Sequence, residues 1–370
     1  MKVATTTLVF CGAALLSLGM VILYSSKGYQ YLLLQSLWAL LGLTGCILAA
    51  TLDYRKLKSV SWLLLLVAIV LLGIVLIPHV GLKANGARRW LGIGSFRIQP
   101  SEFAKLALIL ALAHYGDRYQ RQMPTFLRGL VIPVSVISLV LGLIFVEPDR
   151  GTTILVGLVS GIMLLIAGVR WRYIIPPVLA GLCVLGVSLS GDRMRSDRIY
   201  SWLHLEETRL GTGMQGYQAM VALGSGGTTG LGLGNGRQKT GFIPEHHTDF
   251  IFSVVGEELG LAATLAVLAT FMVLVVCGAF IATRARDTFG LLLSSGITFL
   301  IGIQAFINIG VVTSALPNKG MALPFISYGG SNLVVVLTAV GLLLSVARQG
   351  VVRSARSSNP FQEHSSPQLA

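Results

Sequence analysis

The sequence predicts an all-α integral membrane protein, a polytopic bundle of about ten transmembrane helices. Of its 370 residues, 54% are hydrophobic and only 12% are charged, and the mean hydropathy is +0.77. Apolar runs of about 20 residues recur, more than a soluble core of this length can bury. These runs are rich in Leu, Gly and Ala and do not alternate. They therefore favour helices over the strands of a membrane barrel.

Each apolar run is predicted to be one membrane span. The first run follows Lys2 and lacks a cleavage site of small residues, so we interpret it as a retained helix rather than a signal peptide. The fourth run is short and the eighth is long, so a tilted or merged segment would change the count by one. The predicted spans are residues 7–24, 32–51, 60–80, 102–115, 127–146, 152–168, 173–190, 256–282, 288–313 and 331–347.

The distribution of Lys and Arg predicts the orientation. Half of the 28 basic residues lie close to span ends on the side of the termini, whereas many of the others lie between residues 191 and 248. Because the positive-inside bias is strong only in short loops, we expect both termini in the cytoplasm and an extracytoplasmic loop at about 191–249. Residues 1–348 then form one membrane domain, and residues 349–370, rich in Ser and polar residues, form a disordered cytoplasmic tail.

A net charge of +13 would also suit a nucleic-acid-binding protein, but no basic domain stands apart from the spans. The charge is better explained by topology and by contact with anionic membrane lipids, so no nucleic-acid partner is expected. The four cysteines lie inside apolar runs and show neither a disulfide framework nor zinc spacing.

A glycine-rich run, residues 223–236, resembles a nucleotide loop only superficially. No Gly-Lys-Ser/Thr follows it and no βαβ unit surrounds it, so no organic cofactor is expected. The run does offer backbone N–H groups close to Arg237 and Lys239. Together they predict a loop that binds an anion.

Two other connections carry unusual charge. In residues 81–105, Arg88 and Arg89 are placed to bind a phosphate, while Glu102 and Lys105, three apart after Pro100, are placed to pair on one helix face. This connection is either an interfacial loop with a snorkelling ion pair or a cationic wall for a lipid phosphate. In the turn at 147–153, Pro148 and Gly151 break the helix, and Asp149 is placed to cap the next one.

Residues 243–260 concentrate acids and histidines beside an apolar run, and Asp249 stands just before that run. Three interpretations stay open: a helix N-cap, a metal site with Glu245, His246 and His247, or a catalytic carboxylate. Walls formed by Phe250 and Phe252 would raise the pKa of such an acid, which suits a general base. Deeper in the run lie Glu257 and Glu258, for which Lys105 or Lys319 would be a partner.

Several long motifs, in this order along the chain, resemble the SEDS (shape, elongation, division, sporulation) family. They are Arg-Ile-Gln-Pro-Ser-Glu-Phe-Ala-Lys at 97–105, Ala-Leu-Gly-Ser-Gly-Gly at 222–227, His-Thr-Asp-Phe-Ile-Phe at 247–252, Glu-Glu-Leu-Gly at 257–260 and Leu-Pro-Phe-Ile-Ser-Tyr-Gly-Gly-Ser at 323–331. The resemblance extends from the first span to Arg348. Residues 85–90, 216–218, 234–239 and 317–320 are more similar to the cell-division branch than to the elongation branch.

The resemblance implies a bacterial inner-membrane peptidoglycan glycosyltransferase at the division septum. Its substrates would be lipid II and the growing glycan strand, and its partners a class B penicillin-binding protein of the FtsI type and other division proteins. The essential loop aspartate of the family matches Asp249, and His247 and Ser327 lie in matching motifs. The turn at 147–151 departs from the family, which more often has Gln-Pro-Asp-Leu-Gly, because Arg150 places a charge where an apolar residue is usual.

The resulting hypothesis makes Asp249 the base that removes the proton from the GlcNAc 4-hydroxyl of lipid II, with undecaprenyl pyrophosphate as leaving group. Cations are expected to bind the pyrophosphates, directly or through a divalent cation such as Mg²⁺ or Mn²⁺. A lipid II flippase and a non-catalytic scaffold that recruits a transpeptidase remain alternatives. The substrate-binding candidates are Arg88, Arg89, Glu102, Lys105, Arg237, Lys239, His247, Glu258, Lys319 and Ser327.

Overall fold

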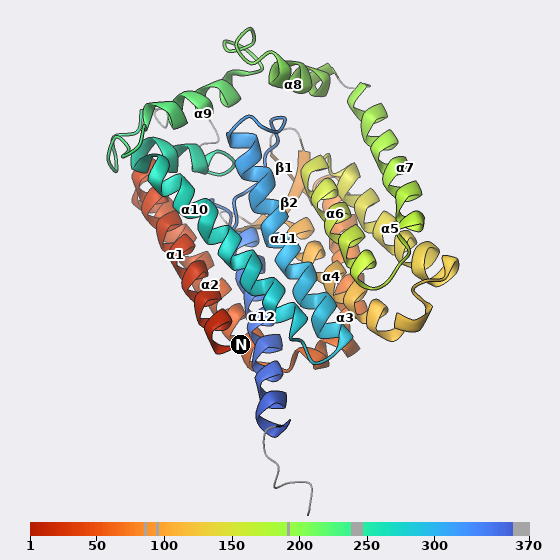
Figure 1. The fold of residues 1–370 in the computed structure, drawn as a ribbon. Helices are drawn as coiled ribbons and strands as arrows, with labels where there is room; N and C mark the ends of the chain where they lie inside the picture. Colours follow the sequence, from red (N-terminus) through yellow and green to blue (C-terminus); the bar gives the residue numbers. More distant parts are fainter. Residues whose placement is uncertain (85–86, 94–95, 191–192, 238–246, 358–370) are drawn as a thin grey trace, which may run out of the picture.

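The computed structural model describes residues 1–84, 87–93, 96–190, 193–237 and 247–357, and the chain is almost entirely helical (Figure 1). Each predicted span coincides with one helix. These helices are α1 (Lys2–Lys27), α2 (Tyr29–Thr51), α3 (Leu57–Leu76), α4 (Pro100–Arg118), α5 (Ile132–Val146), α6 (Arg150–Ile166), α7 (Trp171–Ser190), α10 (Ile251–Thr283), α11 (Thr288–Val312) and α12 (Gly330–Ser357). The prediction of a polytopic helical membrane bundle is confirmed.

Eight of these helices are long and apolar enough to cross a membrane within the described part of the chain, and α6 is a shorter apolar helix. The helix predicted to be short, α4, is longer than expected because Pro100 begins it and it runs to Arg118. The long eighth span has a structural cause. Gly260, with φ 78°, interrupts α10, so a short helix from Ile251 leads into the spanning segment.

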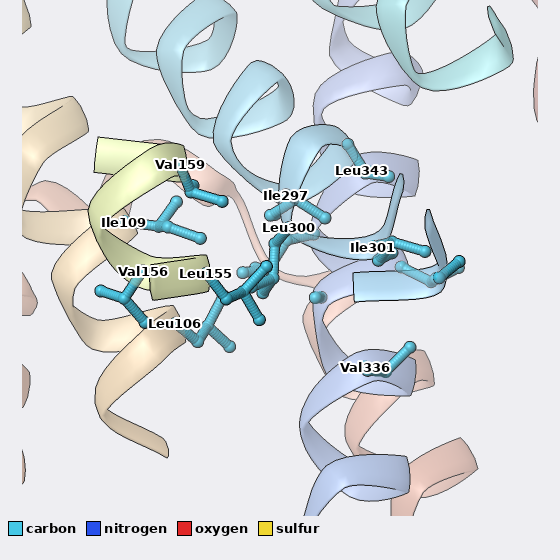
Figure 2. Packing of buried hydrophobic residues seen from close by; sticks show 14 of the residues in the cluster. Leu106, Ile109, Leu155, Val156, Val159, Ile297, Leu300, Ile301, Val336 and Leu343 are labelled. Carbon is cyan, nitrogen blue, oxygen red and sulfur yellow. The ribbon is translucent and has the colours of Figure 1, made fainter. Parts of the chain in front are cut away.

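The centre of the bundle is formed by α4, α6, α11 and α12. Figure 2 shows their apolar side chains in contact across the interior. Small residues bring other helices close to this centre: a Cβ at Gly341 of α12 would overlap with the backbone of Cys46 in α2. In contrast, none of residues 171–188 in α7 is buried, and α7 stands at the edge of the bundle (Figure 1). The labelled core residues are Leu106, Ile109, Leu155, Val156, Val159, Ile297, Leu300, Ile301, Val336 and Leu343.

Met1 and the last turns of α12 lie at one end of the bundle, which we call the termini end; the connections α2–α3 and α10–α11 also lie there (Figure 1). The shared side of the termini agrees with the even number of spans. The short helices in these and neighbouring connections are η1 (Tyr54–Lys56), η2 (Gln120–Gln122) and the π-helical η3 (Leu127–Val131). The tail predicted from residue 349 begins within α12, which runs to Ser357, and the remainder lies outside the described residues.

The opposite end, which we call the loop end, contains secondary structure that was not predicted from the sequence. The connection at 81–99 forms a three-stranded antiparallel sheet in the order β1 (Leu82–Ala84), β2 (Ala87–Ile93), β3 (Phe96–Ile98). Trp90 of β2 pairs with Leu82 of β1, and Leu91 of β2 pairs with Ile98 of β3. The long loop contains the helices α8 (Arg193–Leu203) and α9 (Met214–Ser225), which cross this end (Figure 1).

Candidate functional site

Asp249 lies in the turn immediately before α10, at the loop end. Phe250 rather than Asp249 occupies the N-cap position of α10, and no side chain caps that helix, so the N-cap interpretation is wrong. The Asp249 carboxyl instead lies against Gly320, where a Cβ atom would overlap with Oδ2. This close approach of backbone to carboxyl is possible because residue 320 has no side chain.

An amide from α11 holds the two segments that meet at Asp249. Asn308 Nδ2 donates to the backbone carbonyl of Asp249 at 2.8 Å and to that of Met321 at 2.6 Å. Asn308 is buried, so these bonds are shielded from water. Asn308 was not predicted from the sequence as a residue of the site. The available signal was a carboxamide in an otherwise apolar span, where polar groups are expensive unless they have a function.

Ser327 fixes the other side of the same junction. Its hydroxyl donates to the carbonyl of Thr248 at 2.5 Å and accepts from the N–H of Leu323 at 2.7 Å. The N–H of Tyr328 donates to the carbonyl of His247 at 3.0 Å. Ser327 therefore orders backbone in this structure and is itself buried. The His247 ring packs against the ring of Tyr328 at 5.9 Å between centroids.

Lys319 is a cation that immediately precedes Gly320, the residue that the Asp249 carboxyl contacts. Its Nζ lies 4.0 Å from Asp149 Oδ1, and its side chain is largely buried. Burial, together with the charges of Arg89, Arg198 and Arg150, lowers the pKa of Lys319 to about 8, while Asp149 opposes them. The charged groups that act on Lys319 are thus three arginines and one aspartate, a cationic excess that suits the binding of an anion.

The turn between α5 and α6 brings Asp149 to the same place. The N–H of Thr152 donates to Asp149 Oδ1 at 3.2 Å, which confirms the predicted helix cap. The Thr152 hydroxyl and the Gln99 amide donate to Oδ2 at 2.8 and 3.4 Å. Asp149 is buried, and these bonds give both of its carboxyl oxygens a hydrogen-bond partner.

The two arginines of β2 have different surroundings. Arg89 reaches the α5–α6 turn, where its Nε donates to the carbonyl of Glu147 at 3.0 Å and its Nη2 to that of Pro148 at 2.6 Å. Arg88 is the preceding residue of the strand, opposite Lys83, and is half-buried. Because side chains alternate along a strand, Arg88 points to the other face of the sheet.

The predicted pair Glu102–Lys105 forms, with 2.7 Å between Glu102 Oε2 and Lys105 Nζ. It is not the snorkelling pair of an interfacial loop, since both side chains are buried in the bundle. Lys105 also donates to Gln304 Oε1 at 3.2 Å, and Gln304 Nε2 donates to Asn332 at 3.1 Å. A polar chain thus runs through α4, α11 and α12. Its member in α11, Gln304, was not predicted from the sequence, although it too is a carboxamide in an apolar span.

Another polar cluster forms where the glycine-rich run packs on α10. Glu258 accepts from the Ser25 hydroxyl at 2.6 Å, and Glu257 accepts from the N–H of Arg237 at 2.7 Å. Lys105 and Lys319, the partners expected for these acids, instead lie next to Glu102 and Asp149. Further N–H groups of the run donate to the carbonyls of Glu257 and Glu258. The glycine run thus holds α10, whereas Lys239 lies outside the described residues.

Helices α8 and α9 cover the loop that carries Lys319. Trp202 Nε1 of α8 donates to the carbonyl of Ser314 at 2.8 Å. Asn318 Nδ2 donates to Gln215 Oε1 of α9 at 3.3 Å. The long connection is therefore part of the site and not only a link between spans.

The metal-site interpretation falls partly outside the described chain, because Glu245 and His246 are not among the described residues. Within the described part, no group of three or more His, Cys, Asp and Glu side chains is placed to hold a metal ion.

This fold and site define a class: a polytopic membrane protein with a buried acid and cations at one end of its bundle. Comparison with known proteins identifies the family. Residues 5–351 match the model of the FTSW_RODA_SPOVE family, described as cell cycle protein, and the chain belongs to this family. The resemblance to the SEDS family seen in the sequence is thereby confirmed.

Individual relatives cover nearly the whole chain. A protein of Geobacter metallireducens named "Probable peptidoglycan glycosyltransferase FtsW" is 42% identical over 344 residues, 90% of this chain and 92% of the relative. The "Stage V sporulation protein E" of Bacillus subtilis is 40% identical over 353 residues, 92% of this chain and 96% of the relative.

Solved structures share the fold. One, described as "Structural coordination of polymerization and crosslinking by a peptidoglycan synthase complex", has a TM-score of 0.79 and 29% identity and covers 93% of this chain and 97% of its own. The rod shape determining protein RodA of Thermus thermophilus has a TM-score of 0.69 and 29% identity, covering 92% and 96%.

Proposed function

We propose that this protein is a peptidoglycan glycosyltransferase that polymerises lipid II into β-1,4-linked glycan strands during septal cell-wall synthesis. One observation carries the proposal: the Asp249 carboxyl lies against Gly320, which follows Lys319 in the chain, and Asn308 and Ser327 bind the backbone carbonyls of Asp249 and Thr248. Fixed geometry of an acid and a cation is what a transfer between two lipid-linked sugars requires. The names of the relatives support the same reaction class.

Asp249 acts as the general base in this mechanism. It removes the proton from the GlcNAc 4-hydroxyl of the acceptor, and the oxygen attacks the anomeric carbon of the lipid-linked MurNAc at the end of the strand. The bond from that carbon to the pyrophosphate oxygen breaks. A single displacement inverts the α-linked donor to a β-linkage, so no enzyme nucleophile is needed.

Undecaprenyl pyrophosphate leaves with negative charge, which the cations at the loop end stabilise. Two candidates are Lys319, whose Nζ lies 4.0 Å from Asp149, and Arg89, which donates to the backbone of the α5–α6 turn. Arg88, Arg237 and Lys239 are candidates for the phosphates of the second lipid-linked substrate. A divalent cation, Mg²⁺ or Mn²⁺, would supply further positive charge to the pyrophosphates.

The partners and location follow from the same proposal. A solved relative belongs to a peptidoglycan synthase complex that couples polymerization and crosslinking, which supports a class B penicillin-binding protein as partner here. We place the protein in the bacterial inner membrane at the division septum, with other division proteins. The termini end would face the cytoplasm and the loop end the periplasmic side, where the glycan is assembled.

Purified protein with labelled lipid II tests the proposal, with and without a cognate class B penicillin-binding protein. Asp249→Asn should lower the polymerisation rate by roughly 10²- to 10⁴-fold, because a neutral amide cannot accept the proton. Asp117→Asn, the same substitution at the termini end, is the matched control and should retain the rate.

Two results would overturn this assignment. Polymerisation by Asp249→Asn at the normal rate would show that another group is the base. Transfer of lipid II across liposome membranes by wild-type protein that forms no polymer under any of these conditions would favour the flippase. Activity is measured beside thermal unfolding, so that a loss caused by misfolding is recognised.

A further inference from the structure

Glu147, the residue that follows α5, is a buried acid for which the mechanism above has no use. Its side chain is fully buried, at 0% exposure. Neither carboxyl oxygen has a hydrogen-bond partner in the described part of the chain. A buried ionised carboxylate without such bonds is strongly unfavourable, whereas a neutral carboxylic acid is much less so.

The surroundings of Glu147 disfavour its ionised form although arginines are close. Arg89 and Arg150 donate to backbone carbonyls at the end of α5, those of Glu147, Pro148 and Phe145, and not to the Glu147 carboxyl. The C-terminal end of a helix is itself electronegative. Burial and the charge of Asp149 raise the pKa of Glu147 to about 8, with Arg89 opposing them. Glu147 therefore carries its proton at neutral pH.

The proton on Glu147 changes the charge of the candidate pyrophosphate site. The charged groups around this turn are Arg89 from β2, Asp149 and Arg150 from the α5–α6 turn, and Lys319 from the α11–α12 loop, with Arg198 of α8 also acting on Lys319. While Glu147 is neutral, cations exceed carboxylates here. Its ionisation adds a negative charge in a region of low dielectric, where charge interactions are strong.

We propose that Glu147 regulates the charge of this site: as a neutral acid it preserves the cationic excess that binds the pyrophosphate of a lipid-linked sugar, and loss of its proton weakens that binding. Glu147 acts through Arg89 and Lys319 and does not touch the substrate, so it is a positioning residue. This inference rests on the proposed function, since it concerns the anionic group of the same substrate.

The first measurement is the KM for lipid II between about pH 6 and about pH 9.5. Lys319 has a pKa in the same range and would also lose charge, so the comparison is made in a Lys319→Arg background, whose residue 319 stays protonated. In that background KM should rise on the order of tenfold through pH 8, with kcat nearly unchanged. Adding Glu147→Gln should abolish the rise.

A matched control removes an acid elsewhere. Glu207→Gln likewise replaces one carboxyl group by an amide, but Glu207 is an exposed residue after α8. It should leave the pH profile of KM as it was. If Glu207→Gln flattens the profile as fully as Glu147→Gln does, general electrostatics explains the effect and the proposal fails.

Infrared difference spectroscopy gives a readout that needs no activity. The spectrum of wild type minus Glu147→Gln at pH 7 should contain the C=O band of a protonated carboxylic acid, and this band should disappear above pH 8. Its absence at pH 7 would overturn the proposal, whether or not the variant is active.

Binding of undecaprenyl pyrophosphate in detergent separates this inference from the proposed function. Weaker binding above pH 8 that depends on Glu147, in a protein that forms no polymer, would leave the charge regulator standing and remove the glycosyltransferase. Normal polymerisation with the same pH profile of KM in Lys319→Arg and in Lys319→Arg with Glu147→Gln would support the glycosyltransferase and overturn the role of Glu147.

Discussion

The two ends of the bundle treat charge differently. At the termini end, carboxylates have close partners: Lys58 Nζ lies 2.8 Å from Asp117, and Asp287 accepts from the Tyr54 hydroxyl at 2.9 Å and lies 3.4 Å from Arg55. At the loop end, Glu147 has no bond to its carboxyl within the described residues, and Lys319 stays 4.0 Å from Asp149.

The difference separates charge that stabilises the fold from charge kept for binding. Paired groups at the termini end join η1, α3, α4 and the start of α11, and so fix how the spans connect. Buried groups with incomplete partners at the loop end lower stability, and they persist in proteins chiefly where binding or catalysis requires them. The buried pair Glu102–Lys105 lies between these extremes, since its charges are compensated but removed from water.

Breaking that buried pair should give the largest effect on stability. Lys105→Met leaves the Glu102 carboxylate buried without its cation, and we expect unfolding to become easier by roughly 3–5 kcal/mol. Thermal unfolding in detergent, followed by circular dichroism, measures the change. The combined variant Lys105→Met with Glu102→Gln has no buried charge and should recover most of the loss. Equal melting temperatures for the single and combined variants would show that the pair is not coupled.

Gly320→Ala tests whether the loop end is arranged for catalysis. The new Cβ would overlap with Asp249 Oδ2 and displace the carboxyl. A shift of about 1 Å at a reacting group lowers rates by as much as 10²-fold, so kcat should fall by roughly tenfold to a hundredfold. Polymerisation of labelled lipid II measures it, and thermal unfolding should change little.

The control for this substitution is Gly142→Ala in α5. No atom lies within 4 Å of the position of a new Cβ there, and alanine favours a helix. It should retain the rate. A normal kcat for Gly320→Ala would mean that the position of Asp249 seen here is not the one that the reaction uses.

The parts of this protein that depend on neighbouring residues were predictable from the sequence. Ten apolar runs predicted ten helices because span length follows from membrane thickness. The spacing of Glu102 and Lys105 predicted their pair, and the position of Asp149 predicted its cap, since both interactions join residues within one helical turn.

The parts that depend on distant residues were not predictable in this way. Asn308 contacts Asp249 only because α11 packs beside the turn before α10, and no local pattern encodes that packing. Gly320 meets the same carboxyl through a loop after α11. The strands β1 and β3 have three residues each, too few for an alternating pattern to be recognised.

The smallest effect is expected from Lys58→Met at the termini end. The side chains of Lys58 and Asp117 are 31% and 25% exposed, so water screens their interaction and its loss should cost about 1 kcal/mol or less. The melting temperature should drop slightly at low salt, and the difference from wild type should shrink at high salt because ions screen the wild-type pair. Polymerisation should continue at the wild-type rate. A loss of activity comparable to that of Gly320→Ala, with the fold intact, would show that the termini end also acts on the reaction and would end the division between the two ends.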